Sequence, residues 1–245
     1  MAKKKKKTSN LIMMISGISG VVILSLLLFV FITGKNSGTS ENTSSEAQWV
    51  LPTRAKLEFT RVLQNPELPT GCEITALTAV LNFYGYDVDK MYMTKNYLEL
   101  GTLYKDSFSA KFIGEPWDEE GYGCYAPVIF DSASKYLNDM KSELNVYNIS
   151  GSDMTVLFAE VSKGHPVLVW TNMDLNESPT VKEIKLENGN IERWIVPEHC
   201  VVLTGYDYDK GSVCISDPLG RFEEIDMDKF NKRYVEHMSQ ALVIK

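Results

Sequence analysis

The segment from Leu11 to Thr33 constrains this chain more than any other feature, because it is uncharged and almost wholly apolar. As a helix it is long enough to cross the ~30 Å hydrocarbon core of a bilayer. Five consecutive lysines, Lys3 to Lys7, precede it, and basic residues beside a span favour the cytoplasmic side. We therefore expect a basic cytoplasmic tail over residues 1–10, a transmembrane signal-anchor over residues 11–33, and an extracellular remainder held at the cell membrane by this single pass.

A cleaved signal peptide is the alternative interpretation of this segment. Its apolar region is typically about 7–15 residues long, shorter than the run seen here, which favours an anchor that is kept. The small residues after Thr33 leave cleavage open, and no cysteine follows closely enough to suggest a lipid anchor. Residues 34–48 are small and polar, as in a flexible linker. From residue 49 to residue 245 the composition is that of one globular domain.

The charge of this domain argues against nucleic acid as a partner. The chain has 25 basic and 32 acidic residues, a formal net charge of −7. Five of the basic residues are Lys3 to Lys7, so the rest carries 20 basic against 32 acidic residues. Phosphate binding requires basic patches. An acidic body is compatible with cationic peptides, although most acidic surfaces are simply solvated.

The apolar pattern changes from helical to strand-like along the domain, which predicts an α+β fold. Thr70 and Glu73 resemble a capping box at the start of a helix that Gly85 stops. Further helices are expected over Ala126–Asn138 and Asp153–Lys163, the latter ended by Gly164. The strands expected after them are Val167–Trp170, a hairpin of Val181–Leu186 with Ile191–Val196, and a hairpin of Cys200–Tyr206 with Ser212–Ser216.

Cys72 lies in the first turn of the first predicted helix, where a thiol can be activated. The attacking species is the thiolate, and the unpaired amides and positive dipole end of a helix favour it. The same amides can donate to a developing oxyanion. Gly71 would let a substrate backbone come close, whereas the carboxylate of Glu73 opposes thiolate formation. The alternative is that Cys72 is a small buried core residue.

The candidate general base is His199, one of only three histidines. If Asp207 pairs with Gly211 in the second hairpin, His199 lies diagonal to Asp217. If Gly205 pairs with Gly211 instead, His199 lies directly opposite Asp217. Both registers put the two side chains on one sheet face, and a slip of one residue would separate them.

A carboxylate on one imidazole nitrogen leaves the other free to accept the thiol proton. A pair of His199 and Asp217 that only stabilises the sheet is the alternative. His165 and His237 fit structural or exposed roles better.

These residues lie in motifs that resemble a known family. The motifs are QNPELPTGCEITAL from Gln64, GYGCYAP from Gly121, HCVVLTGYD from His199 and the tripeptide Ser216-Asp217-Pro218. They resemble the stand-alone peptidase-like proteins related to bacteriocin-leader (double-glycine) cysteine peptidases, a papain-like group frequent in Gram-positive bacteria. The resemblance runs from Leu51 to the C-terminus.

The resemblance implies a papain-like fold, with N-terminal helices packed on an antiparallel sheet. It also implies catalytic roles for Cys72, His199 and Asp217. The family's oxyanion-hole glutamine would be Gln64, although it lies further upstream of the cysteine than is usual. The chain lacks the several spans and the GxxxxGK[ST] loop of a bacteriocin exporter, so leader cleavage coupled to export does not carry over.

We therefore expect a membrane-anchored extracellular cysteine peptidase that hydrolyses a peptide or protein substrate without a cofactor. No pair of cysteines has metal-ligand spacing with a histidine partner, so no metal is expected. A non-catalytic peptide- or wall-binding module and a peptidoglycan amidase or endopeptidase are the alternatives. The loop from Gly114 to Gly123 either borders the cleft or is a structural loop packed by Trp117. Outside the cell, a disulfide among Cys124, Cys200 and Cys214 is possible.

Overall fold

The computed structural model describes residues 50–245 of the chain. The expected tail, transmembrane anchor and linker over residues 1–48 lie outside these described residues. No helix within residues 50–245 combines the length and the apolar character needed to cross a bilayer.

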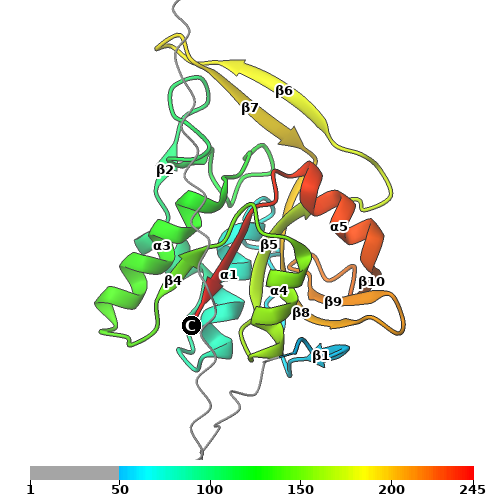
Figure 1. The fold of residues 1–245 in the computed structure, drawn as a ribbon. Coiled ribbons are helices and arrows are strands. Elements are labelled where there is room, and N and C mark those ends of the chain that lie inside the picture. Colours follow the sequence, from blue (N-terminus) through cyan, green and yellow to red (C-terminus); the bar gives the residue numbers. More distant parts are fainter. Residues whose placement is uncertain (1–49) are drawn as a thin grey trace, which may run out of the picture. The chain divides into compact units, whose positions relative to one another are not determined.

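The described residues form five helices and eleven strands (Figure 1). The helices are α1 Cys72–Phe83, α2 Lys90–Tyr97, α3 Ala126–Asp139, α4 Met154–Ser162 and α5 Met227–Glu236. The strands are β1 Arg54–Lys56, β2 Leu100–Gly101, β3 Phe112–Ile113, β4 Val146–Asn148, β5 Val167–Asn172, β6 Thr180–Lys185, β7 Ile191–Val196, β8 Glu198–Asp207, β9 Ser212–Ser216, β10 Glu224–Asp226 and β11 Ala241–Ile244.

An antiparallel sheet forms the centre of the domain and confirms the α+β prediction. Its strand order is β10-β9-β8-β5-β11-β4, and β1 pairs with the end of β8. Every residue of β5 is buried, and so is every residue of β8 except the last. A strand buried on both faces loses the alternation of apolar and polar residues, so helices must cover both faces of this sheet.

Helices do cover both faces, and only one of these layers was expected from the sequence. Helices α1, α2 and α3 pack on one face, against Leu168 and Trp170 of β5 and Val202 of β8. Helices α4 and α5 pack on the other, against Val169 and neighbouring residues. The expected N-terminal helical layer is therefore confirmed, whereas α5 was missed because most of its residues are polar. Figure 1 shows the sheet between these two sets of helices.

The predicted helix ends agree with the structure to within a few residues. Gly85 and Gly164 follow α1 and α4 with φ of +88° and +97°, a left-handed conformation that glycine adopts without strain. Asp89 caps the unpredicted helix α2, since its carboxylate accepts hydrogen bonds from the amides of Met91 and Tyr92.

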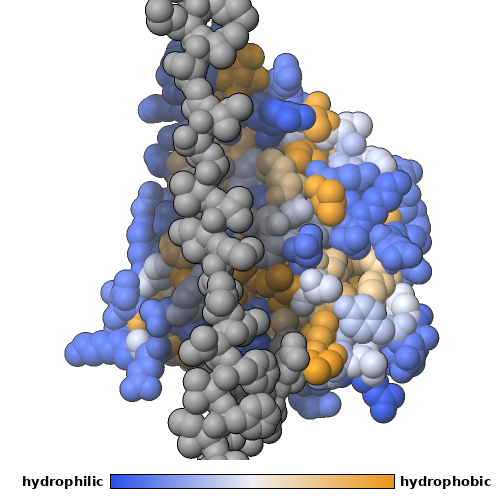
Figure 2. Space-filling model, in the orientation of Figure 1, coloured by the Kyte–Doolittle hydropathy of each residue, from blue (hydrophilic) through white to orange (hydrophobic). Residues whose placement is uncertain are grey.

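The predicted hairpin of β6 and β7 forms a two-stranded sheet of its own, separate from the central sheet. In Figure 1 it projects beyond the end of the central sheet. Its turn uses Gly189 at φ +90°. The described surface visible in Figure 2 is mostly hydrophilic, with hydrophobic residues interspersed among the polar ones.

The second predicted hairpin forms with an unexpected register at its turn. Asp207 pairs with Ser212, whereas we expected Asp207 or Gly205 opposite Gly211. Continued along both strands, the observed register would place His199 and Asp217 on opposite faces of the sheet.

A β-bulge corrects this register before the strands reach the site. The shift lies between Leu203 and Gly205, where Thr204 is the extra residue. A bulge inserts one residue into one strand and so reverses which face the following side chains meet. Beyond it the pairs are Leu203 with Ile215 and Val202 with Ser216, which is the register that puts His199 and Asp217 on one face.

The two-sided burial of β5 gives a testable prediction. Leu168→Ala removes packing against α1–α3, and Val169→Ala removes packing against α4 and α5. We expect losses in the free energy of unfolding of about 2–5 kcal/mol and about 2 kcal/mol, respectively, measured by urea unfolding. Val181→Ala on the exposed hairpin should change it by less than about 0.5 kcal/mol. A negligible effect of Val169→Ala would contradict the second helical layer.

Candidate active site

Helix α1 begins at Cys72, and its first turn is built differently from the expected capping box. Gly71 is the N-cap residue and no side chain caps the helix. The hydroxyl of Thr70 donates to the carbonyl of Asp118 at 3.0 Å, and its amide donates to Pro116 at 3.2 Å. The capping-box prediction is therefore wrong, because the loop after Gly114 competes successfully for Thr70.

Gly71 and Gly121 allow the two segments to approach each other. A Cβ on Gly71 would lie 2.9 Å from Cβ of Leu68 and 3.1 Å from Cβ of Pro116. A Cβ on Gly121 would lie 2.3 Å from Oγ1 of Thr70. Gly71 is thus required by packing within the protein, whereas the close approach of a substrate that we expected stays a prediction.

His199 and Asp217 meet as the sequence predicted. Nε2 of His199 lies 2.6 Å from Oδ1 of Asp217, and both side chains are buried. The other ring nitrogen, Nδ1, has no hydrogen-bond partner within the described residues. A histidine held by a carboxylate on one nitrogen and free on the other can accept a proton at the free nitrogen.

Asp217 stays ionised in this pair. Burial alone would raise its pKa, but the hydrogen bond and charge interaction with His199, together with the amides of Leu219 and Arg221, lower the pKa to about 2. Those amides donate to Oδ1 and Oδ2 at 2.8 Å and 3.1 Å. The loop after β9 therefore fixes the carboxylate that orients the imidazole.

Cys72 and His199 line one cleft of about 390 Å³. The thiol lies close to the start of β8, since the amide of Cys200 donates to Sγ of Cys72 at 3.4 Å. The structure thus brings together the three residues predicted from the sequence, with Asp217 behind His199. The complete lining is Gln64, Pro69, Thr70, Cys72, Glu119, Glu120, Gly121, Tyr122, Met173, Lys182, Trp194, Val196, Glu198 and His199.

Gln64 also reaches this cleft despite its distance from Cys72 in the sequence. The amide of Leu68 donates to the carbonyl of Gln64 at 3.0 Å, so the intervening segment folds back in a turn. Nε2 of Gln64 donates to the carbonyl of Pro69 at 2.7 Å, which leaves one of its two protons for another acceptor. The amide of Gln64 donates to Pro218, beside Asp217.

The loop from Gly114 to Gly123 borders the cleft, as one of our two interpretations of this segment predicted. Glu119, Glu120 and Tyr122 contribute to the lining. Trp117 does not pack this loop: its side chain is exposed, and Nε1 donates to Glu115 within the loop.

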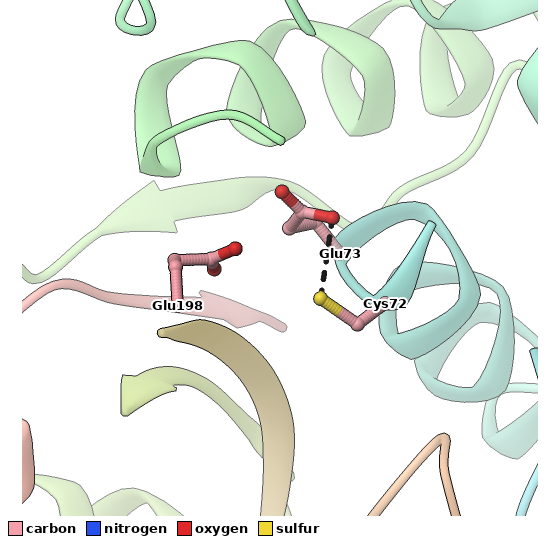
Figure 3. Close-up of side chains that lie close together, drawn as sticks. All are labelled: Cys72, Glu73 and Glu198. Carbon is pink, nitrogen blue, oxygen red and sulfur yellow. Dashed lines mark hydrogen bonds between the residues drawn. The ribbon is translucent and has the colours of Figure 1, made fainter. Parts of the chain in front are cut away.

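Two buried carboxyl groups beside the thiol were missed as site residues. The thiol of Cys72 donates to Oε2 of Glu73 at 3.3 Å, and Oε1 of Glu73 accepts from the amide of Cys124 at 2.7 Å. Ligand atoms of Cys72, Glu73 and Glu198 lie within 4.8 Å of one another. Figure 3 shows these three side chains close together. Glu198 could have been found from strand alternation, since it shares a face of β8 with Cys200, which packs toward α1.

This environment opposes thiolate formation. Burial, followed by the charges of Glu73 and Glu198, raises the pKa of the Cys72 thiol well above its ordinary value. The expectation of a lowered thiol pKa from the helix end is not met in this arrangement. Burial likewise raises the pKa of Glu73 to about 7, and burial with the nearby Glu73 charge raises that of Glu198.

The remaining histidines and cysteines lie outside this arrangement. Nδ1 of His165 lies 3.0 Å from Oε2 of Glu160. His237 is buried, and this burial lowers its pKa to about 4. All four cysteines are free thiols, so no disulfide joins Cys124 or Cys214 to another cysteine.

The raised pKa of Glu73 predicts a pH dependence of stability. Between its ordinary pKa of 4.5 and its folded pKa of about 7, the folded state keeps a proton that the unfolded chain has lost. Stability therefore falls as the pH rises through this window. Glu73→Gln is neutral and can still accept from the Cys124 amide. Relative to this variant, we expect the free energy of unfolding of the wild type to fall by on the order of 1–3 kcal/mol from pH 5 to pH 8.

Urea unfolding at a series of pH values measures this difference. Glu119→Gln, which neutralises an exposed glutamate at the same cleft, is the matched control and should follow the wild type. A difference in the free energy of unfolding between wild type and Glu73→Gln that does not change with pH would contradict the raised pKa of Glu73.

Comparison with known proteins agrees with this fold. A model of the Peptidase_C39 like family matches residues 56–242. The uncharacterized protein YvpB of Bacillus subtilis is 32% identical over 185 residues, which cover 74% of this chain and 71% of YvpB. A putative C39-like peptidase from Bacillus anthracis has a crystal structure that matches with a TM-score of 0.67 and 29% identity, over 78% of this chain and 97% of that one. The chain therefore belongs to the Peptidase_C39 like family.

Proposed function

We propose that this chain is a cysteine peptidase that hydrolyses a peptide bond in a peptide or protein substrate. Cys72 is the nucleophile, His199 the general base and acid, and Asp217 the group that orients His199. Membership of a peptidase-like family supports this reaction class. Residues 11–33 would hold the enzyme at the cell membrane, with the cleft facing outward, as the lysines before the span favour.

One observation carries the proposal. His199 is hydrogen-bonded to Asp217 through Nε2 while Nδ1 has no partner, and Cys72 lines the same cleft. An imidazole nitrogen without a partner, in the same cleft as a thiol, is available to accept the proton of that thiol as it attacks.

The reaction would proceed in two steps. Sγ of Cys72 attacks the substrate carbonyl carbon while its proton passes to Nδ1 of His199. The amide of Cys72, with the second Nε2 proton of Gln64, donates to the oxyanion. His199 then protonates the leaving amine, the C–N bond breaks, and an acyl-enzyme remains. Water attacks this thioester with His199 as base, which releases the acid and restores the thiol.

The resting thiol must first leave Glu73. Because its proton is held by the Glu73 carboxylate and its pKa is raised, a thiolate–imidazolium pair is not formed in advance. The proton would instead transfer as the carbonyl is attacked, after the thiol rotates toward His199. This resembles the general-base mechanism of serine hydrolases more than that of a preformed thiolate.

Cleavage of peptides should depend on Cys72 and His199. We expect Cys72→Ala and His199→Ala in the full-length, detergent-solubilised chain each to lower the cleavage rate by about 10³-fold or more. The measurement is mass spectrometry of a peptide library after incubation. Cys214→Ala removes a half-buried cysteine outside the cleft lining and should cleave like the wild type. Cleavage that persists in folded Cys72→Ala would refute the proposal.

The reactivity of the thiol without substrate should be limited by Glu73. We expect slow alkylation of Cys72 by iodoacetamide at pH 7, and faster alkylation in Glu73→Gln by up to about tenfold for each unit by which the thiol pKa falls. Rates are measured against pH, with the modified residue identified by peptide mapping. An equal rate in wild type and Glu73→Gln across the pH range would show that Glu73 does not hold the thiol proton.

A further inference from the structure

Three ligand-bearing side chains converge beside the cleft, although no metal site was expected from the sequence. Sγ of Cys72 and one carboxylate oxygen each from Glu73 and Glu198 lie within 4.8 Å of one another, and all three residues are buried. Figure 3 shows the thiol and both carboxyl groups directed at one another, two from the start of α1 and one from the start of β8.

Glu198 is left without a partner in this cluster. It is only 7% exposed, and its Oε1 has no hydrogen-bond partner among the described residues. No lysine, arginine or histidine within residues 50–245 forms an ion pair with Glu198 or with Glu73. A buried carboxyl oxygen without a partner is costly and calls for a ligand, an ion or a water molecule.

The backbone leaves space for this convergence. Gly123 has φ of +139°, and a Cβ there would lie 2.7 Å from Oε1 of Glu73 and 3.1 Å from Oε2 of Glu198. Any other residue at this position would push the two carboxyl groups apart. Gly123 therefore permits two acidic side chains to occupy one buried space, although they repel each other when ionised.

The donor set identifies the class of cation that fits. A thiolate is a soft ligand that Mg²⁺ and Ca²⁺ do not favour, whereas Zn²⁺ and Cd²⁺ bind thiolate together with carboxylate. Three protein ligands leave one tetrahedral position for water. Cys72 and Glu198 both line the cleft, so the cation and its water can enter from solvent.

We propose that Cys72, Glu73 and Glu198 form a binding site for one divalent cation of the Zn²⁺ class, at the sulfur that would otherwise attack substrate. Formation of the metal–sulfur bond displaces the thiol proton to solvent. The bound cation shares one lone pair of the sulfur and lowers its nucleophilicity, so the site acts as a reversible block on the nucleophile. This last consequence rests on the proposed peptidase function, whereas cation binding itself does not.

Cadmium titration of the full-length chain, freed of metal by a chelator and kept in detergent, tests the site directly. We expect one equivalent of Cd²⁺ to produce the ultraviolet charge-transfer absorption of a cadmium–thiolate bond, and Zn²⁺ to displace it. Cys72→Ser should abolish this absorption. Loss of a residue that merely supports a ligand costs about 10–100-fold in metal affinity, so Glu198→Gln, which removes a ligand, should weaken binding by at least this factor. If Glu198→Gln fails to fold, Glu73→Gln serves instead and should weaken Cd²⁺ binding by the same factor.

Two controls separate this site from other sources of binding. Cys214→Ala keeps Cys72 and removes the most accessible of the other thiols, and Glu119→Gln removes an acidic group from the same cleft outside the cluster. Both should bind Cd²⁺ like the wild type. Absence of binding to the wild type, an absorption that survives Cys72→Ser, or unchanged affinity in both folded glutamine variants of the cluster would overturn the proposal. The cadmium absorption needs no substrate, so the two proposals can fail separately. A chain that binds Cd²⁺ but cleaves no peptide would refute only the peptidase function. A chain that cleaves peptides but binds no Cd²⁺ would refute only the metal site.

Discussion

The amino end of α1 packs against the first residues of β8, and the candidate site depends on this contact. The amide of Cys200 donates to the sulfur of Cys72, which links two segments that are far apart in the sequence. Strand β8 can hold His199 and Glu198 in fixed positions because helices cover both of its faces. His199 and Glu198 therefore lie on a strand of which every residue but the last is buried, where displacement would cost packing energy.

The same contact creates an environment that a cysteine nucleophile does not ordinarily prefer. Burial, followed by the charges of two adjacent carboxyl groups, raises the pKa of the Cys72 thiol. Such a site can still react if His199 removes the proton during attack. In the proposals made above, the acidic cluster that disfavours the free thiolate would also supply ligands for a cation. Cys72 would then be a nucleophile that is held inactive until a substrate or a change in metal occupancy releases it.

Alternation and spacing in the sequence predicted the pair of His199 and Asp217, but the strand register that produces this pair differs from the expected one. The observed register at the turn would have separated the two side chains, and the bulge at Thr204 brings them back to one face. The pattern of apolar residues along a strand rarely shows where a β-bulge lies. The capping-box prediction failed for a similar reason. The hydroxyl of Thr70 donates to the carbonyl of Asp118, and the carboxylate of Glu73 accepts from the amide of Cys124.

The sequence alone determined the α+β class, the helix that presents Cys72, the two hairpins and the candidate residues Cys72, His199 and Asp217, because these follow from local periodicity, turn residues and motifs. Gln64 was implied only by the resemblance to a family. The tertiary structure decided what surrounds them. The second helical layer, the fold-back that brings Gln64 to the cleft, and the meeting of Glu73 with Glu198 depend on contacts between distant segments. Such contacts set burial and charge at the thiol, and local periodicity does not say which distant segments meet.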